Sequence, residues 1–403
     1  MITTANAETK QSPIEKSLTR LIEGDADTLS AQLQQLRARA FPPTAQKELR
    51  KFAPGEAAKL LGISDVYLRT LVNEGVIGDA EKNAAGRRLY SLEQIHALRE
   101  HLGKNKKAYI QRREADDRLQ VIAVTNFKGG SGKTTTAAHL AQYFALRGYR
   151  VLAADLDPQA SLSALFGIQP EFDLEPNQTL YGAIRYDDAQ RPLRDIIRKT
   201  YFTGLDIIPG NLELQEFEHE TPRALTSSTR SSDKMFFTRV ASALSSVETD
   251  YDVVVLDCPP SLGYLTLSAL CAATSVLVTI HPQMLDVASM SQFLHMTAGL
   301  FDVVERAGGN ASYDWFRYVL TRYEPNDSSQ SQIAGLLKSL FGDRVLTSSM
   351  VKSAAISDAG ITKQTLYEVG RENFHRQTYD RAIEALDAVN GELEQLVKEA
   401  WGR

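Results

Sequence analysis

One glycine-rich segment constrains this chain more than any other. Residues 124–141 read VTNFKGGSGKTTTAAHLA, so an expected strand ends near Asn126 and a helix is expected from Lys133. The glycines at 129, 130 and 132 carry no Cβ, which lets backbone N–H groups wrap closely around phosphate oxygens. A helix N-terminus adds a positive dipole end. The segment therefore predicts a phosphate-binding loop between a strand and a helix.

The polar residues of this loop have expected roles. Lys133 would supply positive charge to the β- and γ-phosphates, and the Thr134 hydroxyl is placed for Mg²⁺. The standard spacing has glycine at position 127, where this chain has Phe127, and a second lysine, Lys128, stands at the loop entrance. The expected nucleotide-binding residues are Lys128, Gly129, Gly130, Ser131, Gly132, Lys133, Thr134 and Thr135.

Carboxylates follow two of the other expected strands. VLAADLDPQ places Asp155 and Asp157 at the carboxyl end of one strand, and DVVVLDCPPSLG places Asp257 at the end of another. Ligands of open α/β sheets bind at these ends. Asp257 is the natural partner of Mg²⁺, through water, and Asp157 would orient the attacking water or hold the water shell of the metal. We therefore expect Lys133 and Asp157 to be catalytic, and Thr134, Asp157 and Asp257 to hold the metal.

Apolar runs alternate with segments of helical periodicity from Leu119 onward. A continuous run such as VVVL indicates a strand buried on both faces, hence a mostly parallel, doubly wound α/β sheet in a domain spanning residues 119–403. The expected strands are 121–126, 151–155, 205–209, 253–257, 275–280, 318–321 and, more weakly, 344–347.

The charge differs between the two parts of the chain. Residues 1–119 carry 20 Lys/Arg and 16 Asp/Glu, a net charge of +4, whereas residues 120–403 carry 25 and 34, a net charge of −9. A mildly basic front joined to an acidic back suggests two separate tasks. Because the net charge is −5, any nucleic-acid binding must come from local basic patches.

The segment PGEAAKLLGISDVYLRTLVNEG fits a helix-turn-helix register, with Gly62 at the turn and Ser64 as the N-cap of the second helix. The expected buried residues are Ala57, Ala58, Leu61, Ile63, Leu68 and Leu71. Arg69, Thr70 and Asn73 would reach base edges or phosphates, and Arg87 and Arg88 would meet phosphate from a following wing turned by Gly86. The alternative is a small helical domain used only for protein contacts.

Two further segments flank this front domain, which we place at residues 46–103. Residues 1–45 form an expected helical arm with apolar clusters at Leu18, Leu21 and Ile22 and at Leu29, Leu33 and Leu36. A helix break is expected at Gly24 and Asp25, with Asp27 or Thr28 as the next cap. This arm either packs on a later domain or pairs with a second copy. The charged residues 104–118 predict a linker.

Three motifs resemble a known family. KGGSGKTT, DLDPQASLS and DCPPSLG are similar to the deviant Walker motifs of the ParA/MinD group of ATPases. The resemblance implies ATP/ADP and Mg²⁺ as cofactors, slow hydrolysis and a nucleotide-driven homodimer. It also implies that Lys128 is a catalytic residue that contacts the nucleotide of the partner subunit, where a cation donated in trans offsets the repulsion between two triphosphates.

The whole chain resembles the larger plasmid-partition ParA proteins, in particular RepA of repABC plasmid operons. The segment MVKSAAISDAGITKQTLYEV carries this similarity near the C-terminus. It implies a dimerising arm, a MerR-like winged domain that represses its own operon, ATP-dependent non-specific DNA binding and a ParB-type partner that stimulates hydrolysis. By position, Lys352 is the expected non-specific DNA contact and Lys363 a weaker one. Related ATPases often read adenine with an asparagine at the end of a late strand, but this strand ends in VLTRYEPND with Thr321 and Arg322 at that place. We take His281, Gln283 and Asp286 as structural.

Several other classes of protein are disfavoured. A polar start without an apolar stretch, no run of about 18 apolar residues and only two cysteines favour a cytoplasmic protein without a membrane partner. The resemblance to DNA-binding partition ATPases implies that it is nucleoid-associated. A MinD-like membrane-cycling ATPase would need a basic amphipathic C-terminal helix, but residues 376–403 hold four Lys/Arg against six Asp/Glu. Two alternative functions are not excluded by the sequence: a transcription repressor that only senses nucleotide, and a chromosome-partition ATPase.

Overall fold

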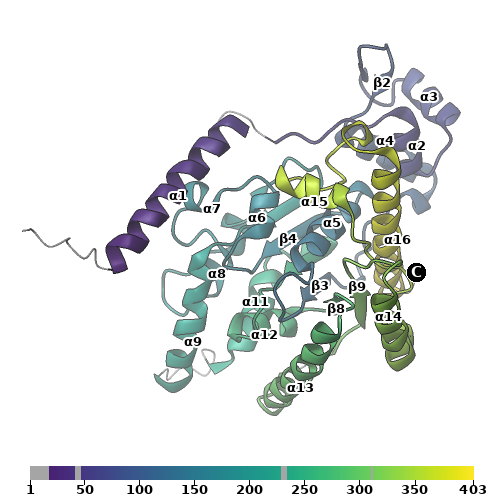
Figure 1. Cartoon of the computed structure of the whole chain (residues 1–403). Helices are drawn as coiled ribbons and strands as arrows, with labels where there is room; N and C mark the ends of the chain where they lie inside the picture. Colours follow the sequence, from purple (N-terminus) through teal and green to yellow (C-terminus); the bar gives the residue numbers. More distant parts are fainter. Residues whose placement is uncertain (1–17, 41–46, 228–233, 310–311) are drawn as a thin grey trace, which may run out of the picture. The chain divides into compact units, whose positions relative to one another are not determined.

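The computed structural model describes residues 18–40, 47–227, 234–309 and 312–403 (Figure 1). Its contacts divide the chain into two compact units, Met1–Lys47 and Glu48–Arg403. Among the described residues, no helix combines the length and apolar character needed to cross a bilayer. How residues 48–403 divide into further domains stays a prediction.

The first unit contains α1, Leu18–Ala40. The expected break at Gly24 and Asp25 is wrong, because the helix continues through both residues. The Thr28 hydroxyl donates 2.7 Å to the Gly24 carbonyl inside the helix, so it does not cap a new one. Leu18 and Leu29 are exposed within this unit, and the side chains of Leu33 and Leu36 lie outside the description.

A seven-stranded sheet organises the second unit, in the order β5-β6-β4-β7-β3-β8-β9. All neighbouring strands are parallel except β5, which pairs antiparallel with β6. The strands are β3 Gln120–Thr125, β4 Val151–Asp155, β5 Arg198–Lys199, β6 Leu205–Ile208, β7 Val253–Asp257, β8 Ser275–Ile280 and β9 Trp315–Leu320. The expected mostly parallel α/β sheet is therefore confirmed, and β5 is an addition at its edge.

The expected strand at 344–347 is wrong. Residues Gly342–Arg344 form a turn of 3₁₀ helix, and Val345 makes only an isolated bridge to Tyr318 of β9. The segment is too short to extend the ladder beyond β9. It still belongs to the core, because Val345 and Leu346 are both buried.

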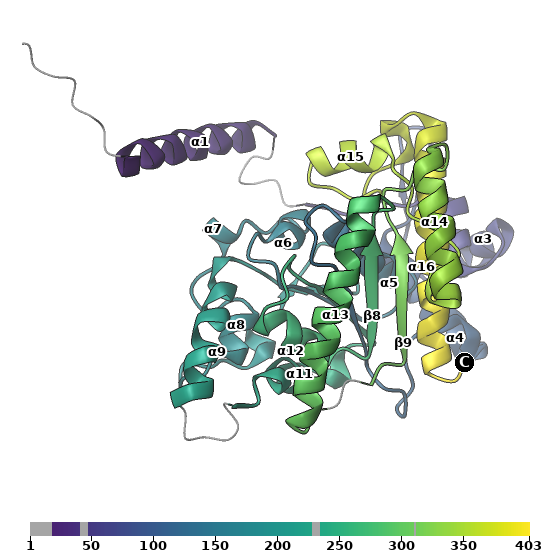
Figure 2. The same cartoon turned by 60° about the horizontal axis from the view of Figure 1, so that its bottom comes forward.

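Helices cover both faces of the sheet (Figures 1 and 2). The helices that follow β3 in this unit are α5 Lys133–Leu146, α6 Ser161–Leu165, α7 Pro170–Asp173, α8 Leu180–Ile184, α9 Gln215–Ser227, α11 Arg239–Ser245, α12 Tyr264–Ala272, α13 Met284–Arg306, α14 Ser328–Phe341, α15 Ala354–Ile361 and α16 Arg376–Ala400. Along β3, Ile122 and Val124 join one core while Val121 and Ala123 join the other. This alternation is what a strand covered on both faces requires.

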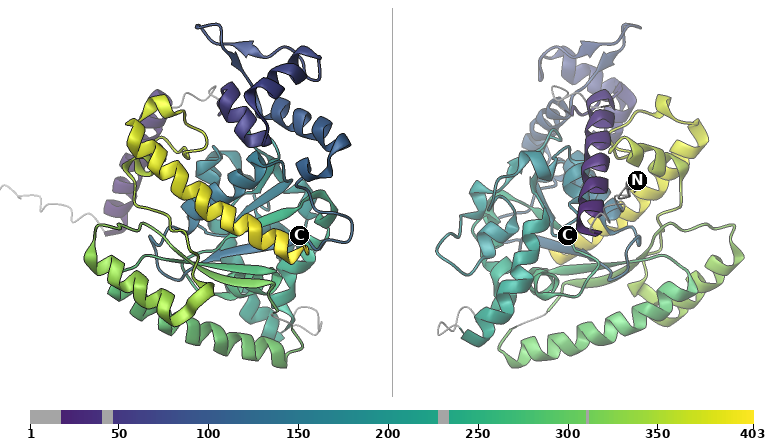
Figure 3. Two further views of the ribbon diagram at one scale, coloured as in Figure 1. Left: turned by 90° about the vertical axis from the view of Figure 1, so that its right-hand side faces the viewer. Right: turned by 60° about the vertical axis from the view of Figure 1, so that its left-hand side comes forward.

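Figure 3 shows the C-terminal helix α16 lying across one face of the sheet, and its apolar side packs into the first of these cores. Leu386, Val389, Leu393 and Val397 are buried there. Because this apolar side is already covered by protein, it is not the exposed face that a membrane-surface helix needs.

The front of the second unit consists of two short helices, a two-stranded ribbon and a longer helix. These are α2 Pro54–Leu61, α3 Asp65–Asn73, β1 Glu81–Lys82, β2 Arg88–Leu89 and α4 Leu92–Asn105. Five of the six expected buried residues are buried, and Ile63 is half-buried. Gly62 adopts φ +70°, which ends α2, and Ser64 accepts a hydrogen bond from the Tyr67 N–H at the start of α3.

Helix α4 joins this front to the sheet. His96 Nε2 lies 2.9 Å from the Ala145 carbonyl oxygen at the end of α5. Arg99 packs closely against Gly148, because a Cβ added at Gly148 would lie only 2.7 Å from Arg99 Cδ. The segment expected to be a linker is also anchored, since Arg113 donates 2.9 Å to the Tyr251 carbonyl. The front and the sheet therefore share one hydrophobic core.

Candidate nucleotide-binding site

The phosphate loop runs from the end of β3 to the start of α5. Gly130 and Gly132 adopt φ +76° and +84°, values that side chains other than glycine rarely tolerate. Lys133 is buried, and its Nζ donates 3.1 Å to the Lys128 carbonyl, so the ammonium folds back over the loop. The backbone N–H groups of the loop and the ammonium of Lys133 therefore surround a space shaped for phosphate.

The ends of β8 and β9 hold this loop in place. The Thr321 hydroxyl donates 2.7 Å to the Ser131 carbonyl, and Thr279 bonds the Ser131 hydroxyl at 3.1 Å. Arg322, which has a positive φ of 51°, donates 3.1 Å to the Gly130 carbonyl. Three residues at two strand ends thus fix the loop before any ligand arrives.

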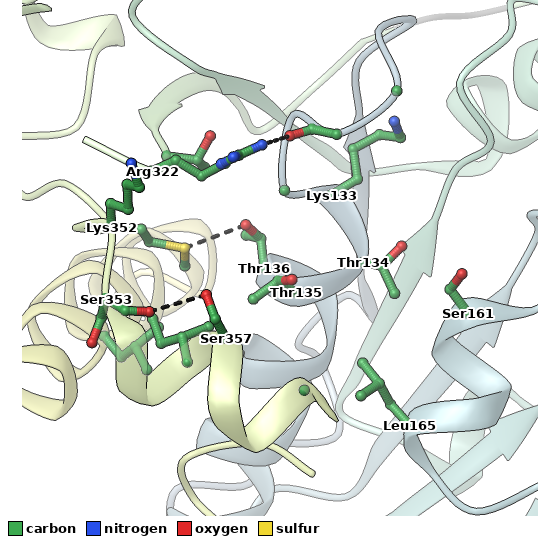
Figure 4. Close-up of a pocket in the computed structure, with 18 of the residues that line it drawn as sticks. Lys133, Thr134, Thr135, Thr136, Ser161, Leu165, Arg322, Lys352, Ser353 and Ser357 are labelled. Carbon is green, nitrogen blue, oxygen red and sulfur yellow. Dashed lines mark hydrogen bonds between the residues drawn. The ribbon is translucent and has the colours of Figure 1, made fainter. Parts of the chain in front are cut away.

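A cavity of about 690 Å³ opens beside the loop (Figure 4). One wall comes from the loop, α5 and α6, and the opposite wall from residues 350–363, with α15 among them. Among the residues expected at the site, those that line it are Gly129, Gly130, Gly132, Lys133, Thr134, Thr135 and Asp157. Ser131 is buried and does not line the cavity.

Asp257 is the clearest sign that a cation belongs here. Both of its carboxylate oxygens are buried, and neither accepts a hydrogen bond of good geometry from a described residue, although the Thr134 hydroxyl lies close enough to lower its pKa. Burial, then the charge of Asp155, raises its pKa well above the ordinary range, while Thr134 and Lys133 oppose the rise. Burial conversely lowers the pKa of Lys133, against the charges of Asp257 and Asp157.

Asp155 plays a different part. Burial raises its pKa to about 6, although it accepts hydrogen bonds of 2.7 Å from both the backbone N–H and the hydroxyl of Ser163. Its oxygens are therefore committed to holding the segment that follows β4. Of the two buried strand-end carboxylates, that of Asp257 is therefore the one left for a cation.

No cluster of three or more metal-ligating side chains occurs within the described residues. A Mg²⁺ ion here would need oxygens from a bound phosphate in addition to Thr134 and Asp257, which is how Mg²⁺ commonly binds in proteins. The residues present therefore fit a magnesium–nucleotide complex better than a metal held by protein alone.

Lys128 lies outside the cavity wall. Its ammonium forms an ion pair with Asp286 at the start of α13, and Asp286 is only 8% exposed. His281 Nδ1 lies 3.6 Å from the same carboxylate, and burial and the charge of Arg322 lower the pKa of His281. Asp286 was expected to be only structural, and no motif marked it as the partner of Lys128.

Other residues at the cavity were not expected from the sequence. Lys352, expected to contact DNA, lines the cavity and pairs with Glu324 at 2.9 Å. Arg322, Ser353 and Ser357 also line it. Lys352, Ser353 and Ser357 belong to the quoted segment MVKSAAISDAGITKQTLYEV, and Arg322 to the strand end examined for an adenine-reading residue. Neither pattern predicts that these side chains line the nucleotide cavity, because they reach it through the fold of the C-terminal segment.

The expected DNA-contacting residues of the front lie apart from this cavity, on α3 and the β1–β2 ribbon. Arg69, Thr70, Asn73 and Arg87 are exposed, and Arg88 is half-buried. The structure places them on neighbouring elements, because Arg88 of β2 bonds Asn73 of α3 at 3.4 Å.

Comparison with known proteins agrees with this geometry. The AAA domain family model (AAA_31) matches residues 119–306. The putative replication protein A of Rhizobium rhizogenes is 55% identical over 99% of both chains. Protein SopA of Escherichia coli K12 is 30% identical over 89% of this chain and 92% of its own.

Solved structures show the same fold. A partition protein superposes with a TM-score of 0.64 at 18% identity, covering 93% of this chain and 98% of its own. The ATP complex of the McdA(D38A) protein of Cyanothece has a TM-score of 0.53 at 19% identity, covering 67% of this chain and 97% of its own.

The motifs, the fold and these two extensive sequence matches agree. The chain belongs to the ParA/MinD-type family of partition ATPases, together with the putative replication protein A of Rhizobium rhizogenes and SopA.

Proposed function

We propose that this protein is a plasmid-partition ATPase whose ATP-bound homodimer binds DNA without sequence preference. The observation that carries the proposal is the buried Asp257 carboxylate beside a cavity lined by the phosphate loop. A carboxylate without a hydrogen-bond partner is costly unless a cation comes to it. Magnesium bound with ATP or ADP would supply that charge.

The expected site residues then have separate tasks, although Asp257 does not line the cavity itself and lies behind Lys133 and Thr134. Lys133 and the loop N–H groups bind the phosphates, and Thr134 and Asp257 hold the metal and its water. Asp157, which lines the cavity, orients the attacking water for slow hydrolysis. The bound metal would neutralise phosphate charge during the reaction.

Lys128 supports the dimeric part of the proposal. It does not line its own cavity, and Asp286 holds its ammonium at the side of the loop. We propose that it leaves Asp286 and contacts the nucleotide of the partner subunit. Two facing triphosphates repel each other, and each lysine offsets part of that repulsion only when both nucleotides are bound.

The DNA and protein partners follow from the family. Relatives named chromosome partitioning protein ParA occur in Caulobacter vibrioides, 32% identical over 60% of this chain and 84% of their own. We propose that a ParB-type centromere-binding protein stimulates hydrolysis and that the ATP-bound dimer associates with the nucleoid in the cytoplasm. Lys352 is a candidate for non-specific DNA contact, for which it would have to leave Glu324.

We further propose that the front of the second unit is a winged helix-turn-helix domain that represses the operon of this protein. Arg69, Thr70, Asn73, Arg87 and Arg88 would meet bases or phosphates. The arm containing α1 would contribute to dimerisation through its exposed apolar residues.

ATP hydrolysis, measured with and without DNA and with and without the product of the neighbouring gene, tests this function. We expect a slow basal rate of ATP hydrolysis and a strong stimulation only when DNA and the partner are both present. Lys133→Ala should show neither the basal nor the stimulated hydrolysis. Nucleotide binding with no hydrolysis under any of these conditions would instead identify a repressor that only senses nucleotide.

A further inference from the structure

Two exposed apolar side chains stand in the first turn of α3. Val66 is 71% exposed and Tyr67 is 42% exposed, and they are the exposed large hydrophobic residues among the described residues 48–118. The fold does not use Val66, because α3 packs through Leu68 and Leu71. A single exposed apolar side chain is common on a protein surface. Two adjacent ones, Val66 and Tyr67, in the first turn of the proposed recognition helix indicate a surface that binds a ligand.

The polar residues of α3 are not equally available. The Thr70 hydroxyl donates 3.2 Å to the Val66 carbonyl, and Asn73 Oδ1 accepts from both terminal nitrogens of Arg88 at 3.4 Å. The Arg69 side chain makes no hydrogen bond or ion pair with any other residue that the structure describes. Of the three residues expected to reach bases, Arg69 is therefore the one whose side chain is available.

Val66 and Arg69 share one face of the helix. They are three residues apart, which places them about 4.5 Å apart along the helix axis. Successive base pairs are about 3.4 Å apart. The two side chains are thus spaced to meet neighbouring base pairs when the N-terminal end of α3 enters a major groove.

The surroundings favour DNA over an apolar protein surface. Arg69 on α3 and Arg87 on the ribbon turn are exposed guanidinium groups without an acidic partner among the described residues. Cationic groups around a small apolar contact match a groove of bases bordered by phosphates.

We propose that Val66 and Arg69 read a thymine and a guanine on neighbouring base pairs, an inference that rests on the proposed DNA-binding role of this domain. Val66 contacts the C5-methyl group of the thymine, and Arg69 donates to O6 and N7 of the guanine. Asn73 reads no base. It is a positioning residue that holds Arg88 beside α3, where Arg88 meets the backbone.

The test begins with full-length protein and a random duplex library, from which bound sequences are selected. Each thymine of the selected sequence is then replaced in turn by deoxyuridine, which lacks only the C5-methyl group. Binding is measured by gel shift against competitor DNA. At one thymine the wild-type protein should lose about fourfold in affinity, the effect of one buried methyl group.

Val66→Ala should show that fourfold loss on unmodified DNA and no further loss on deoxyuridine at this position. Val66→Thr, which keeps a branched side chain with a methyl group, should remain sensitive. Arg69→Ala should lose the preference for guanine at a neighbouring base pair. Leu212→Ala, a change at another exposed apolar residue (65% exposed), should bind like wild type.

The outcomes separate the inference from the function on which it rests. If Val66→Ala still discriminates thymine from deoxyuridine at every position, the inference is wrong while operator binding stands. If wild-type protein selects no sequence at all, the DNA-reading role of the domain fails, and the inference fails with it.

Discussion

The Lys128 ammonium and the Asp286 carboxylate form an ion pair across 158 positions of the chain. The lysine is 39% exposed at its side chain, whereas the aspartate is almost fully buried at the start of α13. This pair holds the lysine away from the cavity of its own subunit. A lysine acting on a partner subunit must first give up this contact.

Asp286→Asn should favour the ATP-bound dimer. The change removes the carboxylate that competes for Lys128, while the amide keeps the size of the side chain. We expect dimers at a several-fold lower ATP concentration than in wild type, measured by light scattering during an ATP titration. An unchanged or higher ATP requirement would show that Asp286 does not compete for the lysine.

Lys133→Ala should abolish nucleotide binding. The buried ammonium is the cation that lies over the phosphate loop, so its loss should weaken ATP binding by 100-fold or more, roughly 3 kcal/mol. Titration calorimetry measures this, with thermal unfolding as a check on folding. Lys199→Ala, at an exposed lysine paired with Asp206, is a matched control that should bind ATP normally.

Asp257→Asn should stabilise the protein without ligand. The folded state raises the pKa of Asp257, so the unfolded state releases its proton more easily and the charge destabilises the fold as pH rises above about 4. At pH 7 we expect a gain of about 1–3 kcal/mol in unfolding free energy, which shrinks as the pH falls.

The same variant should lose the stabilisation that magnesium and ATP give to the wild type. Thermal unfolding with and without both ligands measures the two effects together. A variant that is less stable without ligand, yet equally stabilised by ligand, would contradict a cation-binding role for Asp257.

Stability should also fall at mildly acidic pH through His96. Burial lowers the pKa of His96 to about 4, so below pH 6.5 the unfolded chain takes up a proton that the folded chain does not. The contribution is nil at pH 7 and reaches a loss of about 3 kcal/mol near pH 4. Urea unfolding at pH 7 to 4 measures the free energy of unfolding of wild type and His96→Gln. As the pH falls, the stability of wild type should drop toward that of the variant or below it.

Much of the fold follows from local sequence patterns. The continuous apolar run at Val253–Asp257 predicts a strand covered on both faces, and the glycines of the loop predict its turn into α5. The Leu68 and Leu71 spacing likewise predicts the buried side of α3. These patterns work because the periodicity of each element is set by its own residues.

The rest depends on contacts between distant segments. Nothing around Asp286 indicates that Lys128 will reach it, and nothing around Lys352 indicates that the C-terminal segment will close the nucleotide cavity. The prediction of a break in α1 was wrong for a different reason. Glycine and aspartate lower helix propensity by only about 1 kcal/mol or less, which their helical neighbours outweigh.

The central claim is that Lys128 joins two nucleotide-bound subunits. Light scattering of Lys128→Ala tests it most directly, with calorimetry showing that ATP still binds to the monomer. We predict ATP-dependent dimers for wild type and Lys199→Ala and only monomers, at the same ATP occupancy and protein concentration, for Lys128→Ala. ATP-dependent dimerisation of Lys128→Ala equal to that of wild type would contradict it.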